Sequence, residues 1–400
     1  MKLGIEVFLG DQKKQDSLKG QRVALVAHPA SVNHHLEHTL FLLKNQTSLA
    51  LSAAFGPQHG MRGEKQDNMI ESEEYLDPEL GIPVFSLYGE VRKPTKKMMQ
   101  SFDVLLFDLQ DVGTRVYTFL TTLFYLMDAC EKEQKKLIVL DRPNPAGRAV
   151  EGSLLEEAYQ SFVGAAPMPM RHGLTLGEAG SWYYALKKMS FPFEVICMEG
   201  YRPDEGSFLG WPHFDLPWVN PSPNIPTLWT TWIYPGTVLL EGTTLSEGRG
   251  TTIPLNLVGA KTFDSKKLLK RMKQLAPQWL EGCHLRPLFF EPTFHKYQGS
   301  LCEGFQFHVD DHRLHKNQFS PYRLISLILK CVHESKSTEN LWNPGPYEYV
   351  ENHLPIDVIS GSSKLRHWVE SSSETIGHWD DFLKTDEEQW LKIRQPFLLY

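Results

Sequence analysis

The chain has 400 residues, of which 41% are hydrophobic, and this length and composition predict a globular protein of roughly two or three domains. Its formal net charge of −7 provides no basic excess to neutralise a phosphate backbone, which argues against nucleic-acid binding. The sequence has no apolar run of the roughly 18 residues that span a bilayer, and its first segment lacks the apolar core of a secretory signal. We therefore expect a cytoplasmic protein without membrane association.

Short apolar runs in the first half of the chain each end in a polar cluster. They span residues 22–27, 49–55, 104–107 and 137–140, and helix-like stretches at 36–46, 94–101 and 117–134 lie between them. Continuous apolar strands that alternate with helices are typical of a parallel sheet covered on both faces. Because such strands end at one edge of the sheet, the polar clusters are expected to meet there. The pattern predicts an α/β fold with a Rossmann-like parallel sheet.

The second half of the chain changes character twice. A helix is predicted over 173–189, with Thr175 as its N-cap and Glu178 completing a capping box, whereas 201–255 is rich in Pro, Gly and Trp and predicts loops. Further helices are predicted at 264–276, 321–333 and 380–394, with an extended segment at 284–309. We therefore expect a Rossmann-like catalytic domain over 1–255 and a smaller α+β auxiliary domain over 256–400.

The turn after the first apolar run argues against a nucleotide cofactor. It reads His28-Pro29-Ala30-Ser31-Val32, without the glycines that let a backbone approach a pyrophosphate. The five cysteines show neither paired spacing nor a zinc-ligand pattern. We expect no cofactor and no metal.

The loops that follow the apolar runs, together with the later segments 169–173 and 218–251, contain the candidate site residues. They are Gln58, His59, Arg62 and Glu64; Asp108, Gln110, Asp111 and Arg115; Arg142, Asn144 and Glu151; Arg171 and His172; and Asn224, Glu241, Glu247 and Arg249. Structural alternatives exist for several of them: the 56–64 loop as a solvated turn, Asp111 as a helix cap, and Arg142 as half of a surface ion pair. Trp211, Trp218, Trp229 and Trp232 are candidates for stacking on a sugar, or for ordinary core packing.

Long motifs along the chain resemble the NamZ-type exo-β-N-acetylmuramidases. In order they are GPQHGMRGE (56–64), FDLQDVGTRVYTF (107–119), DRPNPAGRAVEG (141–152), PMRHGLTLGE (169–178), PSPNIPT (221–227), YPGTVLLEGTTLSEGRGT (234–251) and EPTFHKYQGSLCEGFQFHV (291–309). The resemblance covers nearly the whole chain. It implies a Rossmann-like domain, a smaller C-terminal domain and a cleft between them. It also implies release of N-acetylmuramic acid from the non-reducing end of peptidoglycan fragments, so that the expected partner is a peptidoglycan-derived sugar.

One position departs from the family pattern. Many members read Pro-Glu-His-Gly where this chain reads Pro57-Gln58-His59-Gly60, and the resemblance associates that glutamate with catalysis. An amide cannot exchange a proton as a carboxyl does, yet glycoside hydrolysis normally needs two carboxyl groups, about 5–5.5 Å apart for retention or about 6.5–9.5 Å apart for inversion.

A neighbouring carboxyl is therefore expected to replace the one missing at residue 58. Glu64 is the nearest candidate, and the possible partners are Asp108, Asp111, Glu151, Glu241 and Glu247. Alternatively, the 2-acetamido group of the substrate acts as nucleophile. His59 and Asn144 are expected to orient hydroxyls. The lactyl carboxylate of muramic acid needs a cation from among Arg62, Arg115, Arg142, Arg171 and Arg249. The rival hypotheses are a catalytically silent muropeptide-binding protein and a family member with altered sugar specificity.

Overall fold

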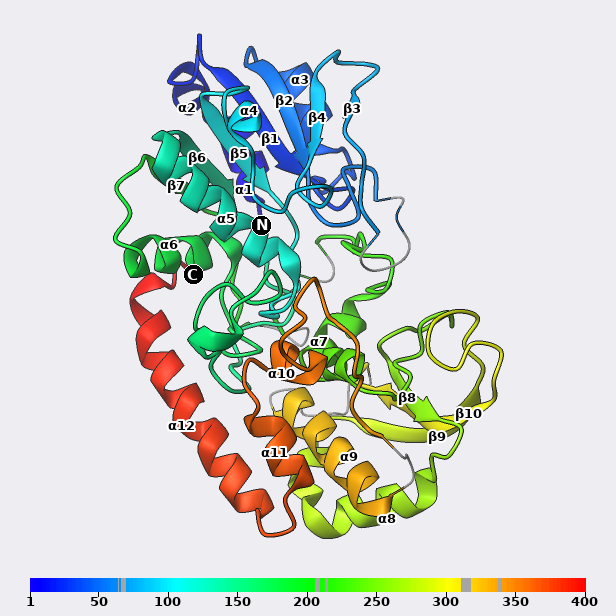
Figure 1. Cartoon of the computed structure of the whole chain (residues 1–400). Helices are drawn as coiled ribbons and strands as arrows, with labels where there is room; N and C mark the ends of the chain where they lie inside the picture. The colour runs from blue at the N-terminus through cyan, green and yellow to red at the C-terminus, as the bar shows by residue number, and fades with distance from the viewer. Residues whose placement is uncertain (64, 66–69, 206–208, 213–214, 311–317, 337–339) are drawn as a thin grey trace.

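The structure, a computed structural model, describes all residues except 64, 66–69, 206–208, 213–214, 311–317 and 337–339 (Figure 1). It confirms the predicted α/β class. The main sheet has the strand order β3-β4-β2-β1-β5-β6-β7, and all its pairs are parallel except β3 with β4. The strands are β1 (Arg22–Ala27), β2 (Ala50–Gly56), β3 (Tyr75–Leu76), β4 (Pro83–Ser86), β5 (Val104–Asp108), β6 (Lys136–Leu140) and β7 (Phe193–Ile196). All four predicted strands are present, whereas the short β3, β4 and β7 were missed.

Helices cover both faces of this sheet because its strands are apolar on both sides. In β1, Ala24 and Val26 belong to one hydrophobic cluster, and Val23 and Leu25 belong to another on the opposite face. The first cluster includes residues of α4 (Lys96–Met99), α5 (Thr118–Glu133) and α6 (Leu176–Leu186), and the second includes residues of α1 (Gly4–Gly10) and α3 (Thr39–Gln46). The short helix α2 (Gln12–Asp16) follows α1. The predicted capping box of Thr175 and Glu178 begins α6.

The C-terminal half contains a second, antiparallel sheet and most of the remaining helices. The order of this sheet is β8-β10-β9, with β8 (Leu257–Ala260), β9 (His284–Phe290) and β10 (Cys302–His308). The helices are α7 (Leu228–Thr237), α8 (Ser265–Leu275), α9 (Pro321–Ser335), α10 (Pro355–Ser360), α11 (Lys364–Glu370) and α12 (Ile376–Arg394), joined by short 3₁₀ turns such as Val238–Gly242. Helices predicted at 264–276, 321–333 and 380–394 are confirmed. The expectation of loops throughout 201–255 is wrong at α7, which has Pro235 inside it.

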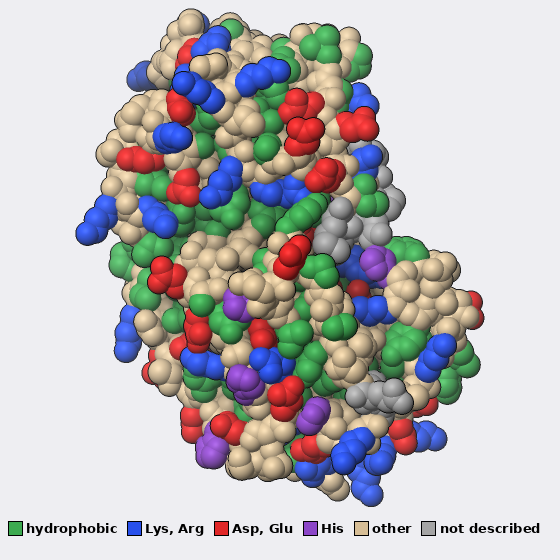
Figure 2. Space-filling view, viewed as in Figure 1, with side chains coloured by type: hydrophobic (Ala, Val, Ile, Leu, Met, Phe, Trp, Pro, Cys, Tyr) green, Lys and Arg blue, Asp and Glu red, His purple; other side chains and the backbone are tan. Residues whose placement is uncertain are grey.

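The two halves share one hydrophobic core. The larger cluster continues from Ala24 in β1 to Trp390 in α12, and Figure 1 shows α12 running along the molecule from the lower half to α6. The second sheet begins directly after residue 256, but the division into two domains at that point remains a proposal. Acidic and basic side chains are interspersed over most of the face shown in Figure 2. None of the helices formed by the described residues is long and apolar enough to cross a bilayer.

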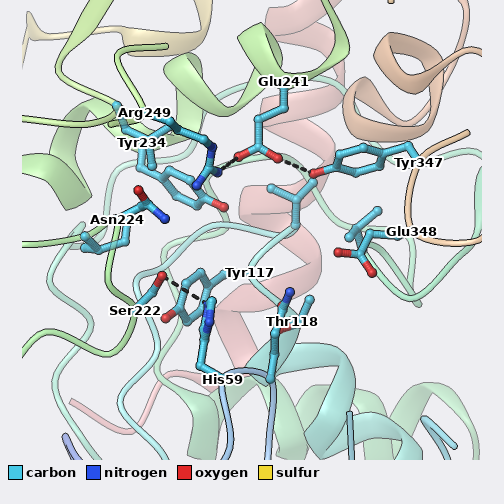
Figure 3. A pocket seen from close by; sticks show the side chains of 15 residues that line it. His59, Tyr117, Thr118, Ser222, Asn224, Tyr234, Glu241, Arg249, Tyr347 and Glu348 are labelled. Carbon is cyan, nitrogen blue, oxygen red and sulfur yellow. Dashed lines mark hydrogen bonds and ion pairs between the residues drawn. The ribbon is translucent and has the colours of Figure 1, made fainter. Parts of the chain in front are cut away.

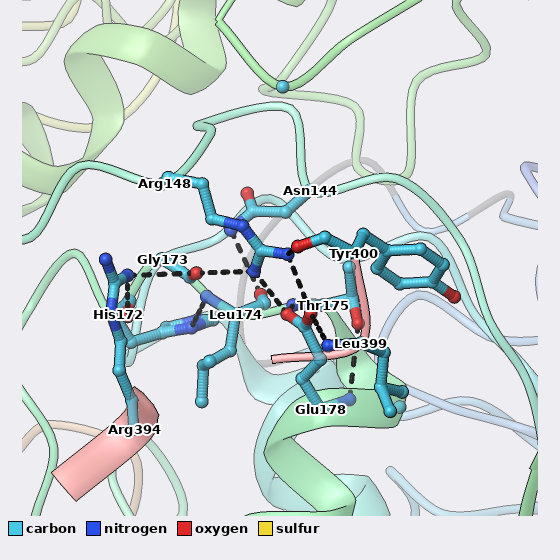
Figure 4. A network of polar contacts seen from close by, with 12 residues as sticks. Asn144, Arg148, His172, Gly173, Leu174, Thr175, Glu178, Arg394, Leu399 and Tyr400 are labelled. Atoms are coloured by element: carbon cyan, nitrogen blue, oxygen red, sulfur yellow. Dashed lines mark hydrogen bonds and ion pairs between the residues drawn. The ribbon is translucent and has the colours of Figure 1, made fainter. Parts of the chain in front are cut away.

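The C-terminus is fastened to the end of β6 by polar contacts, part of which Figure 4 shows. The Tyr400 hydroxyl donates to the Asp141 carboxylate over 2.8 Å, and Arg148 donates to the Tyr400 carbonyl over 3.1 Å. Glu178 of α6 accepts hydrogen bonds from Arg148 and from the Leu399 backbone N–H. The last residues of the chain therefore stabilise the loops at the carboxyl edge of the main sheet.

Candidate active site

A pocket lies beyond the carboxyl edge of the main sheet, close to the place between β1 and β5 where the strand order reverses. Ligands bind open α/β sheets at such places. The pocket is lined by Gln58, His59, Val116, Tyr117, Thr118, Val163, Ser222, Asn224, Ile225, Tyr234, Glu241, Arg249, Leu255, Tyr347 and Glu348 (Figure 3). Five of the residues predicted from the sequence therefore meet here: Gln58, His59, Asn224, Glu241 and Arg249.

The turn after β2 places two of these side chains. The Gly60 backbone N–H donates to the Pro57 carbonyl over 2.9 Å, and His59 has the positive φ of 70° that the third position of a type II turn requires. His59 donates from Nδ1 to the Lys65 carbonyl over 2.9 Å, so a neutral ring accepts at Nε2 from the Ser222 hydroxyl over 3.2 Å. The predicted solvated turn is wrong for these side chains, because both Gln58 and His59 are buried.

The Gln58 amide is fixed through its oxygen. Its Oε1 accepts a hydrogen bond from the Thr118 hydroxyl at the start of α5 over 2.7 Å. The amide also interacts with the Glu348 carboxyl and lowers the pKa of that carboxyl. Since Oε1 is taken by Thr118, the amide nitrogen is the polar atom left to face Glu348.

The opposite wall of the pocket is a buried cluster of charges. Arg249 donates from Nη2 to Glu241 over 2.7 Å and from Nε to Glu247 over 3.0 Å, and Lys296 donates to Glu247 over 2.9 Å. Burial alone raises the pKa of Glu247, but the charges of Lys296 and Arg249 outweigh burial and hold it below the ordinary value. The buried Nη1 of Arg249 has no hydrogen-bond partner among the described residues. This guanidinium N–H is therefore available to donate a hydrogen bond to a ligand.

Glu348 is the second carboxyl group of the pocket, and the sequence did not predict it. It lies in a two-residue turn closed by reciprocal backbone hydrogen bonds between Tyr347 and Val350. Glu348 and Tyr349 have φ values of 47° and 68°, a backbone conformation that residues other than glycine adopt at a cost of about 1–3 kcal/mol each. Such strain is concentrated at functional sites. The Tyr88 hydroxyl donates to the Glu348 carboxyl over 2.9 Å.

The two pocket carboxyls have different surroundings. Glu241 is paired with Arg249 and also accepts from the Tyr347 hydroxyl over 2.6 Å. Glu348 has no such ion pair among the described residues: burial, reinforced by the charge of Glu241, raises its pKa to about 7 against the hydrogen bond from Tyr88. One carboxyl is therefore ion-paired with a guanidinium, and the other holds a proton near neutral pH. This is the asymmetry that acid–base catalysis needs.

Asp108, predicted as catalytic, does not line this pocket. Its carboxylate accepts from Arg142 Nη2 over 2.9 Å and from the Thr39 hydroxyl, and both Asp108 and Arg142 are buried. Gln110 and Asn144 likewise donate to backbone carbonyls of neighbouring loops, at Pro143 over 2.9 Å and at Leu174 over 3.0 Å. These groups lie at the predicted sheet edge, but they hold its loops together.

Glu151 and two predicted arginines also have structural partners. Glu151 is buried and accepts from the Tyr322 and Arg323 backbone N–H groups at the start of α9. Arg115 donates to the carbonyls of Ser153, Met168 and Ile359, and Arg171 donates to the carbonyl of Ala146. None of these three side chains lines the pocket. Their hydrogen bonds join loops of the first half to α9 and to the end of α10.

Asp111, like Glu247, lies behind the pocket wall. It accepts from the Gly113 N–H over 2.7 Å, and His172 Nε2 lies 3.9 Å from the same carboxyl group. Burial raises the pKa of Asp111 to about 7 and lowers that of His172 to about 3, so both are neutral over part of the physiological range. The Asp111 charge contributes to the raised pKa of Tyr117, a lining residue, although burial is the main cause.

The remaining predictions fall outside the pocket or outside the described residues. Arg62 is exposed and lies over the Tyr75 ring at 4.1 Å, and Glu64 is not among the described residues. The four tryptophans pack in edge-on pairs, Trp211 with Trp218 and Trp229 with Trp232, and none lines the pocket. For them the prediction of core packing holds, rather than a stacking platform for sugar.

Comparisons with known proteins agree over the whole chain. The family model "Exo-beta-N-acetylmuramidase NamZ, N-terminal" matches residues 23–229, and the corresponding C-terminal model matches 232–400. The chain is 37% identical to the peptidoglycan beta-N-acetylmuramidase NamZ of Bacillus subtilis over 398 residues, which cover 99% of this chain and 91% of that protein. Crystal structures of two DUF1343 family proteins from Bacteroides fragilis have TM-scores of 0.82 and 0.76 at 30% and 26% identity, covering 100% of this chain and 98% of each of theirs.

Proposed function

Because the chain belongs to the NamZ family of exo-β-N-acetylmuramidases, we propose that it releases N-acetylmuramic acid from the non-reducing end of peptidoglycan fragments. The observation that carries this proposal is the pair of carboxyl groups in one pocket, Glu241 and Glu348, one ion-paired and one protonated near neutral pH. Glycoside hydrolysis uses such a pair, one group to protonate the leaving oxygen and one to assist the attack on the sugar carbon.

Arg249 is the proposed contact for the lactyl carboxylate of muramic acid. Among the five predicted arginines it alone lines the pocket, and it has a buried N–H without a partner among the described residues. Its fork geometry suits a carboxylate. His59 and Asn224 are the proposed partners of sugar hydroxyls. Asn144, which we expected in that role, instead makes hydrogen bonds to the backbone through both its amide nitrogen and its amide oxygen.

The test is hydrolysis of a muropeptide, followed by release of N-acetylmuramic acid. Glu241→Gln is expected to reduce kcat by about 10²–10⁴-fold, the usual contribution of a positioned carboxyl. Glu151→Gln is the matched control, because Glu151 is an equally buried glutamate outside the pocket, and its amide replacement keeps an oxygen that accepts one of the two α9 backbone N–H groups. Equal losses in both variants would contradict the proposal for this pocket.

A silent muropeptide-binding protein is the second candidate, favoured by Gln58 alone. It predicts that the wild-type chain binds N-acetylmuramic acid in calorimetry and releases none from muropeptides, at any pH between 5 and 9. Detectable turnover that Glu241→Gln removes would exclude it.

A cytoplasmic location is also part of the proposal. All five cysteines are free, and four of them are buried, as suits a reducing compartment. Cell fractionation with an antibody against the chain tests this. Recovery mainly from the medium or the cell wall would contradict it.

A further inference from the structure

We propose that Glu348 is the proton donor of this site and that Gln58, which lines the same pocket, keeps that proton from being shared. This assignment rests on the glycosidase function proposed above. It is carried by the geometry of the turn that contains Glu348 and by the direction of the hydrogen bonds around its carboxyl.

Each residue of the turn is fixed by a different contact. Tyr347 donates to Glu241, Glu348 accepts from Tyr88, and the Tyr349 ring lies 4.6 Å from the Arg92 guanidinium. Glu348 and Tyr349 both have positive φ, as a type I′ turn requires, although neither is glycine. A strained backbone that delivers a buried carboxyl into a pocket, with both neighbours anchored, indicates a position kept for chemistry rather than for stability.

The groups that interact with the Glu348 carboxyl are Tyr88, Gln58, Arg92 and Glu241, together with the phenols of Tyr234 and Tyr347. The Gln58 nitrogen is a donor only and cannot take a proton from Glu348. A glutamate at residue 58 would instead share one proton with Glu348, because two adjacent carboxyls do not both ionise readily. In this chain the proton of Glu348 has no acceptor at residue 58 and is available to a ligand in the pocket.

The step balances with water alone. The Glu348 proton moves to the glycosidic oxygen as its bond to the anomeric carbon breaks, and the leaving sugar departs as an alcohol. Water supplies the hydroxyl that the anomeric carbon gains, and the second proton of that water returns to the carboxyl pair. Neither an oxidant nor a cofactor is consumed.

The experiment compares two leaving groups in wild type, Glu348→Gln, Gln58→Glu and the exchange variant Gln58→Glu/Glu348→Gln. In the natural substrate, a muramyl disaccharide, the leaving group is a sugar hydroxyl, whose oxygen needs a proton as the bond breaks. In a 4-nitrophenyl N-acetylmuraminide the leaving group is 4-nitrophenolate, a stabilised anion that needs no proton. We expect Glu348→Gln to lose about 10²–10⁴-fold in kcat on the disaccharide and at least tenfold less on the aryl substrate.

The exchange variant keeps one carboxyl and one amide in contact and guards against a mere folding defect. We expect it to regain at least tenfold of the disaccharide activity that Glu348→Gln lost. We expect Gln58→Glu to move the basic limb of the pH profile upward, because a shared proton is released at higher pH.

The outcomes separate the two proposals. Wild-type chain that cleaves neither substrate overturns the glycosidase function itself. Active wild type together with a Glu348→Gln variant that keeps its activity, or loses it equally on both leaving groups, overturns the assignment of Glu348 and leaves the function intact.

Discussion

The hydrogen bond from Tyr88 to Glu348 gives a quantitative prediction for the substitution Tyr88→Phe. The Tyr88 hydroxyl lies 2.9 and 3.1 Å from the two oxygens of Glu348, and its ring packs in a tilted arrangement against Phe162. Phenylalanine keeps the ring and removes only the hydroxyl. A hydrogen bond to a charged group contributes about 1.5–3 kcal/mol, and one to a neutral group about 0.5–1.5 kcal/mol, so the anion loses about 1–1.5 kcal/mol more than the acid.

That difference corresponds to about one pKa unit, since one unit is about 1.4 kcal/mol. The hydrogen bond from Tyr88 lowers the pKa of Glu348, so its loss raises that pKa from about 7 to about 8. A proton donor works while it is protonated, and activity falls as pH rises through its pKa. The basic limb of the kcat/KM profile should therefore move upward by about one unit, with activity at pH 6 little changed.

The assay is kcat/KM on the muramyl disaccharide between pH 5 and 9. Tyr183→Phe is the matched control, because the Tyr183 hydroxyl also donates to a carboxylate, Asp128, over 3.0 Å, but on the α5–α6 face away from the pocket. It should leave the profile in place. A basic limb that stays fixed in Tyr88→Phe, or that moves downward, would show that the Tyr88 hydroxyl does not lower the pKa of the proton donor.

Three further substitutions separate the pocket from its supports. Arg249→Met leaves two buried carboxylates without their guanidinium. We therefore expect a loss of about 3–5 kcal/mol in the free energy of unfolding, measured by urea denaturation. Unchanged stability would mean that this ion pair does not hold the cluster together. Asp108→Asn breaks the buried pair with Arg142 and should cost stability of the same order, yet leave kcat of the folded protein within about threefold. A stable but inactive Asp108→Asn protein would return Asp108 to the catalytic residues. Tyr400→Phe removes the hydrogen bond to Asp141 and should lower the free energy of unfolding by about 1–2 kcal/mol without changing kcat. An unaltered denaturation midpoint would show that this hydrogen bond does not stabilise the fold.

The fold was predictable from the sequence where burial leaves a continuous trace. A strand of a parallel sheet is apolar on both faces, so the runs that became β1, β5 and β6 could be recognised. The strands β4 and β7 are only four residues long. Because β4 begins with a proline and β7 has a glutamate as its second residue, neither forms a recognisable apolar run. Helix α7 was missed because Pro235 and its threonines have low helix propensity, and burial against α9 overrides that propensity.

The site was predictable in part. Sequence position shows that a side chain follows a strand, but not whether it points into a pocket or toward another loop. Gln58 comes just after β2 and Asp108 is the last residue of β5, yet Gln58 lines the pocket and Asp108 is buried against Arg142. Glu348 left no local signal, because its importance comes from the contact with Gln58 across the two halves of the chain and from a positive φ that glutamate rarely adopts.

The exchange of a carboxyl for an amide at residue 58 therefore has to be judged together with the residue that faces it. An isolated substitution of glutamate by glutamine removes a proton donor. Here the amide interacts with the Glu348 carboxyl, and burial, reinforced by the charge of Glu241, raises the pKa of that carboxyl to about 7. The pair thus retains one exchangeable proton, which a pair of carboxyls would share. What the substitution changes is the residue that carries the proton and the pH at which it leaves, and both can be measured on this chain with Gln58→Glu and Glu348→Gln.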